Sequence, residues 1–106
     1  MELEKTFGET VKKLREARTL TLREVAQELG IDTSMLGKIE KNNRKPTNPL
    51  IEKFAKFFDV SARDLTIAFM SDTVAYHVLI NQDVAQEVLK VAEEKVRYLK
   101  GQKEQV

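Results

Sequence analysis

Helix-start signals recur along this sequence at short intervals, and they limit how long each element can be. At four places a Thr, Ser or Asp that can cap a helix is followed three residues later by an acidic or amide side chain. The four pairs are Thr6 with Glu9, Thr21 with Glu24, Ser61 with Asp64, and Asp83 with Gln86. Two further starts are expected at Asp32 and at Thr47 or Asn48, just before Pro49. The chain is therefore expected to fold as a series of short helices.

Apolar residues recur at the three- and four-residue spacing of amphipathic helices, and no segment alternates long enough to be a strand. Four apolar faces are formed by Phe7, Val11 and Leu14; Leu22, Val25, Ala26 and Leu29; Met35, Leu36 and Ile39; and Leu50, Ile51, Phe54, Ala55, Phe57 and Phe58. A fifth helix is expected to end near Met70, at the polar pair Ser71 and Asp72, and a short sixth helix near Ile80. The last helix is expected to begin after Asp83 and end at Gly101. The predicted fold class is all-α.

Composition excludes several classes of protein. The 106 residues contain no cysteine, so neither disulfides nor thiolate metal sites are available. The start of the chain, MELEKTFGE, does not resemble a secretory signal, and no apolar run is long enough to span a membrane, so a cytoplasmic location is expected. No phosphate-binding loop, catalytic triad or paired carboxylates can be identified. We expect no enzyme, no cofactor and no metal site, and we expect His77, the only histidine, to be a partly buried helical residue.

Gly30 lies between two of the predicted helices. Glycine favours the left-handed conformation that ends many helices, and Asp32 can cap the next helix after a turn of three to four residues. Two short helices joined by such a turn form a helix-turn-helix, whose second helix can enter the DNA major groove. Gly30 alone would also suit an ordinary helix end in any bundle. The spacing of the whole segment from Val25 to Glu40 favours the helix-turn-helix.

That spacing, with the sequence KIEKNNRKP after it, resembles the phage-repressor-like helix-turn-helix regulators, also called the xenobiotic-response-element type. The resemblance covers residues 7–70. It implies a five-helix repressor-like DNA-binding domain over residues 1–70, and a transcription regulator that acts as a homodimer on a palindromic operator. Residues 71–106 are similar to a helical extension of some small members near restriction-modification genes, and we expect one or two dimerisation helices there.

The resemblance also implies a role for particular residues. Base edges are expected to be contacted by Thr33, Ser34, Gly37 and Lys38. Phosphates are expected to be contacted by Arg23, Lys41, Asn42, Asn43, Arg44 and Lys45. Arg15 and Glu40 match a structural ion pair that joins the first helix to the third. The chain departs from the family at Leu22, where many members have a glutamine that binds DNA; Arg23 or backbone N–H groups are the candidate replacements.

Some of these residues have simpler interpretations. Thr33 and Ser34 could be exposed first-turn residues, and Lys38 could face solvent only. Asn42 and Asn43 could close the helix in a left-handed conformation, with or without a contact to DNA.

The apolar face of the last helix must be buried against something. One possibility is the fourth and fifth helices of the same domain. The interpretation that we prefer is a two-fold dimer, because one recognition helix contacts only a few base pairs. The expected interface consists of Tyr76, Val84, Val88, Ala92, Val96 and Leu99. The alternative is an antitoxin-like or other interaction module, whose C-terminal helices bind a different protein.

Overall fold

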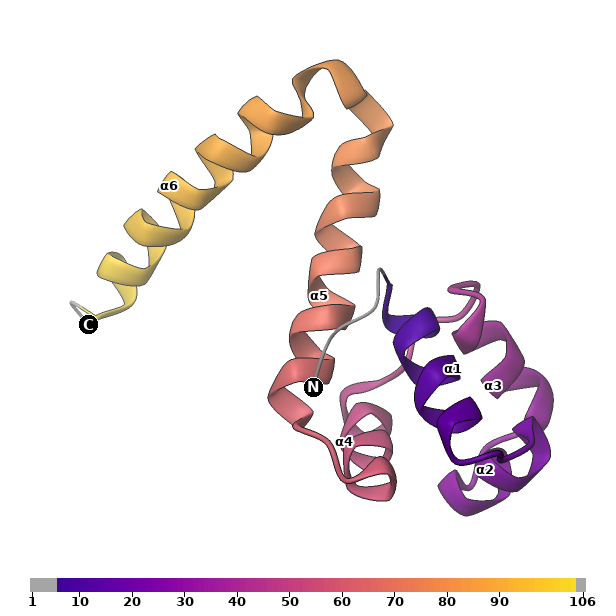
Figure 1. Ribbon diagram of the computed structural model, residues 1–106. Helices are drawn as coiled ribbons and strands as arrows, with labels where there is room; N and C mark the ends of the chain where they lie inside the picture. The colour runs from indigo at the N-terminus through magenta and orange to yellow at the C-terminus, as the bar shows by residue number, and fades with distance from the viewer. Residues whose placement is uncertain (1–5, 105–106) are drawn as a thin grey trace. The chain divides into compact units, whose positions relative to one another are not determined.

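The computed structural model describes residues 6–104, and every regular element among them is a helix (Figure 1). The elements are α1 (Phe7–Ala17), α2 (Leu22–Leu29), α3 (Thr33–Glu40), α4 (Asn48–Phe58), α5 (Ala62–Val78), the 3₁₀ helix η1 (Leu79–Val84) and α6 (Ala85–Glu104). The all-α prediction is confirmed. No helix in this part of the chain combines the length and apolarity needed to cross a membrane.

Side-chain caps begin four of the predicted helices. Thr21 forms the full reciprocal capping box with Glu24. The hydroxyls of Thr6, Thr47 and Ser61 each accept a hydrogen bond from the backbone N–H three residues later. Asp32 caps α3 without a side-chain hydrogen bond. These caps are local in sequence, which is why the sequence could predict them.

The predicted break at Ser71 and Asp72 is wrong, because α5 continues to Val78. Both polar side chains have partners that leave the helix intact: the Ser71 hydroxyl donates to the carbonyl of Ala68, and the Asp72 carboxylate accepts from the backbone N–H of Phe7. The predicted helix end near Ile80 agrees with the structure, because Asn81 inside η1 has a non-helical φ of −130° and ψ of 76°. The last helix begins after Asp83 as predicted, with α6 starting at Ala85, although Asp83 itself lies within η1. The predicted end at Gly101 is wrong, because α6 extends past it to Glu104.

One hydrophobic core joins α1 to the first part of α5. Phe7 packs edge-on against the rings of Phe54 and Phe69, at centroid distances of 6.1 and 5.8 Å. The buried apolar residues are Phe7, Val11, Val25, Ala26, Leu29, Leu36, Ile39, Leu50, Ile51, Phe54, Ala55, Phe58, Leu65 and Ala68. The core therefore fixes α1, α2, α3 and α4 in one packed unit, and α3 takes its place in that unit through Leu36 and Ile39.

The chain divides into two compact units, the first up to Asp72 and the second from Thr73 onward, so that the boundary falls inside α5. In the second unit, here called the C-terminal unit, no described residue is buried. His77 is exposed on the last turn of α5, which corrects the expectation of partial burial. The described residues of the C-terminal unit therefore form no core of their own.

Candidate nucleic-acid interface

The turn between α2 and α3 has the geometry that Gly30 predicts. Gly30 adopts φ 71° and ψ 33°, in the left-handed region that favours glycine. Its N–H donates to the backbone carbonyl of Gln27 at 3.2 Å, and the N–H of Ile31 donates to the backbone carbonyl of Ala26 at 3.0 Å. This pattern closes the C-terminus of α2. Ile31 is half-buried against the core, so that the turn and the start of α3 are held in place.

The outer face of α3 carries the four residues that are expected to contact bases. Leu36 and Ile39 bury the inner side of the helix. Thr33, Ser34 and Lys38 are exposed, and Gly37 is half-exposed on the same outer side. A Cβ atom built on Gly37 would meet no protein atom within 4 Å. The fold therefore does not require glycine at position 37, although glycine weakens a helix.

Four cations lie at or just after the end of α3. The segment that follows α3, residues 41–45, is here called the basic loop. The side chains of Lys38, Lys41, Arg44 and Lys45 are all exposed. None of them has a hydrogen-bond or ion-pair partner among residues 6–104. Their positive charge is available to an anionic ligand, and phosphate groups are the anions that such clusters bind on DNA.

Asn42 and Asn43 differ in their surroundings. Asn42 has φ 63°, a left-handed conformation that asparagine tolerates. Its Oδ1 accepts from the N–H of Gly8 at 3.0 Å, and its Nδ2 donates to the Thr6 hydroxyl at 3.0 Å. The amide of Asn42 is thus engaged within the protein on both sides. Asn43 is exposed and has no side-chain hydrogen bond among the described residues.

Arg15 and Glu40 form a bidentate ion pair between α1 and the end of α3. The Arg15 Nε lies 2.8 Å from Oε2 of Glu40, and its Nη2 lies 2.9 Å from Oε1. Both side chains are largely buried, with 12% and 5% of their surface exposed. The hydrogen bond to Glu40 raises the pKa of Arg15, although burial acts in the opposite direction. Arg15 also donates to the carbonyl of Leu20, which holds the turn before α2.

Leu22, the departure from the family pattern, packs half-buried against the core at the start of α2. Its neighbour Arg23 is exposed. The capping box lowers the pKa of Glu24, first through the hydrogen bond from the backbone N–H of Thr21 and then through the Thr21 hydroxyl. This carboxylate is therefore committed to the helix end. Arg23 is the charged side chain here that is available to a phosphate.

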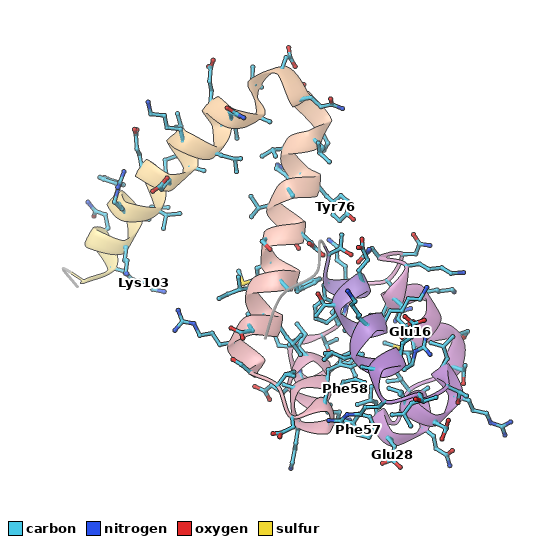
Figure 2. All side chains as sticks on the ribbon, viewed as in Figure 1. Glu16, Glu28, Phe57, Phe58, Tyr76 and Lys103 are labelled. Atoms are coloured by element: carbon cyan, nitrogen blue, oxygen red, sulfur yellow. The ribbon has the colours of Figure 1, made fainter. Side chains whose placement is uncertain are left out.

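Sequence reasoning missed several residues that hold this site together. Gly8 and Asp72 lie at the N-terminus of α1, and their partners, Asn42 and Phe7, are distant in sequence. Thr6 was expected to cap α1, but its hydrogen bond from Asn42 was not expected. Arg18 donates to the carbonyl of Phe57 at 2.9 Å and lies over the rings of Phe57 and Phe58, both labelled at the end of α4 in Figure 2. A glycine inside a predicted helix was the one available signal, because Gly8 weakens α1 unless a close contact requires it.

The residues expected to form a dimer interface lie in the C-terminal unit, where Figure 2 labels Tyr76 on α5. Among them Tyr76 is 51% exposed, Val96 61% and Leu99 62%. Val84, Val88 and Ala92 are also exposed.

No group of three or more His, Cys, Asp or Glu side chains that could hold a metal ion occurs in the part of the chain that the structure describes.

Comparison with known proteins shows the family to which this chain belongs. A family model described as helix-turn-helix matches residues 11–65, which include α2, the Gly30 turn and α3. The chain belongs to this helix-turn-helix family. The family assignment made from the sequence is thereby confirmed, and with it the conclusion that the protein is of a DNA-binding regulator type and not an enzyme.

Three relatives show what this member resembles. An uncharacterised HTH-type transcriptional regulator of Bacillus subtilis, YazB, is 35% identical over 59 residues, which are 56% of this chain and 86% of YazB. The restriction-modification controller protein C.AhdI of Aeromonas hydrophila has 32% identity and a TM-score of 0.52, covering 56% of this chain and 89% of its own. The N-terminal DNA-binding domain of SinR from Bacillus subtilis has 30% identity and a TM-score of 0.54, covering 59% and 93%.

Proposed function

We propose that this helix-turn-helix regulator is a homodimer that binds a palindromic operator in double-stranded DNA and controls transcription from the cytoplasm. Each protomer places α3 in a major groove, and the two recognition helices lie one turn of DNA apart, about 34 Å. The functional division is a DNA-binding domain over residues 1–70 and a dimerisation extension over residues 71–106. The names of the relatives, a transcriptional regulator, a controller protein and a DNA-binding domain, support this proposal.

The exposed polar face of α3, the second helix of the helix-turn-helix, is the observation that carries the proposal. Gly37 lies on this face with open space beside it, which leaves room for DNA to approach the helix backbone closely. Gly101 in α6 has the same open space, so the position of Gly37 among the polar side chains of α3 is what points to DNA. Exposed hydroxyls at Thr33 and Ser34 and the amine of Lys38 surround the same position. These groups match the donors and acceptors of base edges, and lysine suits the O6 and N7 acceptors of guanine.

Phosphate contacts complete the proposed interface. Arg23 at the start of α2 and Lys41, Arg44 and Lys45 in the basic loop are exposed cations with no partner among the described residues. Asn43 can add a neutral hydrogen bond to a phosphate oxygen. Such contacts supply affinity and fix the register of α3 on the duplex, but they select no sequence.

The C-terminal unit supports the homodimer. Every exposed large hydrophobic side chain among the described residues lies between Ile67 and Leu99, and no described residue after Ala68 is buried. A series of large apolar side chains that remains uncovered is typical of an interaction surface. Residues 71–106 carry five Lys and Arg and six Asp and Glu, so two copies would not repel each other strongly. The same apolar face also fits the alternative, an antitoxin-like module that binds another protein there.

Gly37→Ala provides the sharpest test. We expect this variant to unfold at higher urea concentration than the wild type, because alanine favours the helix by about 0.8 to 1.0 kcal/mol. We expect it to bind its operator at least tenfold more weakly, because the new methyl group separates α3 from the base edges, where a good contact contributes about 1 to 3 kcal/mol. The operator is first isolated by selection from a random duplex pool, and affinity is measured by fluorescence anisotropy.

Gly101→Ala is the matched control, because Gly101 is also a helical glycine with open space around it. It should gain stability and keep wild-type DNA affinity. Lys38→Ala should reduce the preference for guanine in the operator. Unchanged affinity in Gly37→Ala, together with unchanged selectivity in Lys38→Ala, would show that α3 does not contact bases.

A further inference from the structure

The N-terminus of α1 is held by side chains from three separate segments. The first N–H groups of a helix have no partner within the helix and need other acceptors. The N–H of Phe7 donates to Oδ2 of Asp72 in α5 at 2.7 Å. The N–H of Gly8 donates to Oδ1 of Asn42 at 3.0 Å, and the N–H of Glu9 donates to the Thr6 hydroxyl at 3.2 Å. All three groups are satisfied, and one acceptor comes from the basic loop.

The end of α3 lies directly against α1 at Gly8. A Cβ atom on Gly8 would lie 2.5 Å from the carbonyl oxygen of Glu40 and 2.6 Å from that of Ile39. It would also lie 2.6 Å from Oδ1 of Asn42. Because two of these atoms belong to the backbone, glycine is required for the last turn of α3 to approach so closely. This close contact fixes the end of α3, where the basic loop begins, against α1.

Asn42 stands where the chain leaves α3. Its backbone N–H donates to the carbonyl of Ile39, and the N–H of Asn43 donates to the carbonyl of Lys38 at 2.8 Å. The left-handed conformation at Asn42 turns the chain out of the helix. From this point its side chain reaches back to Gly8 and Thr6, so one residue both ends the helix and attaches the loop to α1.

We infer that Asn42 is a positioning residue, whose amide bonds to α1 hold the basic loop so that Arg44 and Lys45 reach DNA phosphates. Neither Arg44 nor Lys45 has a side-chain partner among the described residues, so the loop backbone determines where their charges lie. An anchored loop loses less conformational freedom on binding than a free one. The inference rests on the proposed function and replaces the direct phosphate contact that the sequence suggested for Asn42.

The salt dependence of DNA binding distinguishes a positioning role of Asn42 from a direct contact between Asn42 and a phosphate. Each phosphate neutralised by a protein cation contributes about −0.9 to the slope of log affinity against log salt concentration. Asn42 is neutral, so loss of a direct hydrogen bond from it would lower affinity and leave the slope unchanged. Loss of a positioning role would instead remove the contacts of Arg44 and Lys45 and reduce the magnitude of the slope.

Asn42→Gly is the test variant, because glycine keeps the left-handed backbone and removes both side-chain hydrogen bonds. Binding to a random-sequence duplex is measured by anisotropy across a range of salt concentrations, since phosphate contacts require no particular sequence. Urea unfolding verifies that each variant is folded at the temperature of the titration. We expect a slope reduced in magnitude by about 1 to 2, corresponding to one or two lost phosphate contacts.

Asn43→Ala is the matched control, because it removes the neighbouring amide, which has no intramolecular side-chain bond. It should keep the wild-type slope. The substitutions Arg44→Ala and Lys45→Ala together should weaken binding strongly in the wild type and little in Asn42→Gly. A wild-type slope in Asn42→Gly, or equal losses in the two backgrounds, would overturn the inference. Absence of sequence-selective binding by the wild type would instead contradict the proposed function. The two failures can be distinguished, because the slope is measured on a random-sequence duplex and requires no operator.

Discussion

At the scale of single residues, the sequence predicted contacts between near neighbours and missed contacts between distant ones. The left-handed Gly30 and the Thr21–Glu24 capping box involve residues within four positions of each other, so their chemistry is visible in the sequence. The partners of Gly8 and Phe7 are 34 and 65 positions away, and nothing local identifies them. Asp72, which suggested a helix break, instead caps α1 from the middle of α5.

The Glu24 carboxylate gives a pH dependence that belongs to this scale. Hydrogen bonds from Thr21 lower its pKa in the folded state, so its contribution to stability is present above the ordinary glutamate value, about 4.3. That contribution is lost as the pH falls through the lowered folded pKa. We expect wild type to lose stability over this range more steeply than Glu24→Gln. Urea unfolding midpoints between about pH 6 and pH 3 test this expectation; parallel curves for the two proteins would contradict it.

At the scale of elements, the packing of the first unit followed from helical periodicity, whereas the lengths of the later helices did not. The apolar faces around Val25, Leu36 and Phe54 are buried as their spacing indicates. The end of α5 was placed too early because Ser71 and Asp72 are polar in a helix that later leaves the core. Polarity marks solvent exposure or a tertiary partner as readily as a helix end, and only the structure distinguishes them.

The ion pair between α1 and α3 can be tested at this scale. Arg15→Ala removes the cation from Glu40, whose side chain is 5% exposed in the wild type, and breaking such a buried pair costs about 3 to 5 kcal/mol. Replacing both residues, by Arg15→Met and Glu40→Leu, should cost less than Arg15→Ala alone, because no buried charge remains. Arg18→Ala, which removes an exposed arginine, is the control and should cost about 1 kcal/mol.

Urea denaturation measures the free energy of unfolding of Arg15→Ala, of the double variant and of the control Arg18→Ala. If Arg15→Ala costs no more than Arg18→Ala, Glu40 is solvated or has another partner, and the ion pair does not hold α1 to the end of α3.

At the scale of the whole molecule, apolar residues are distributed in two ways. All the buried apolar residues among those described lie between Phe7 and Ala68, and all the exposed large ones lie between Ile67 and Leu99. Periodicity predicted an apolar face on α6, yet periodicity shows only that a face should be covered and not by what. The occupant depends on a second molecule, which no single sequence contains. We propose that it is a second copy of the same chain.

Val96→Glu tests the homodimer, because Val96 lies in the proposed interface and is 61% exposed in the single chain. We expect the wild type to sediment as a dimer and Val96→Glu as a folded monomer, since burial of an unpaired carboxylate is costly. Gln86→Glu adds the same charge on the polar side of α6 and should leave the dimer intact. A wild-type monomer, or a Val96→Glu dimer as tight as wild type, would favour a different protein as the partner.

The most direct measurement of the central claim is an anisotropy titration of wild-type protein on its selected operator and on a scrambled duplex of equal length. We expect two protomers per operator, and affinity for the operator at least about 10³-fold higher than for the scrambled duplex at the same salt concentration. Equal affinity for the two duplexes would contradict the claim that α3, with Thr33, Ser34, Gly37 and Lys38 on its outer face, recognises a DNA sequence.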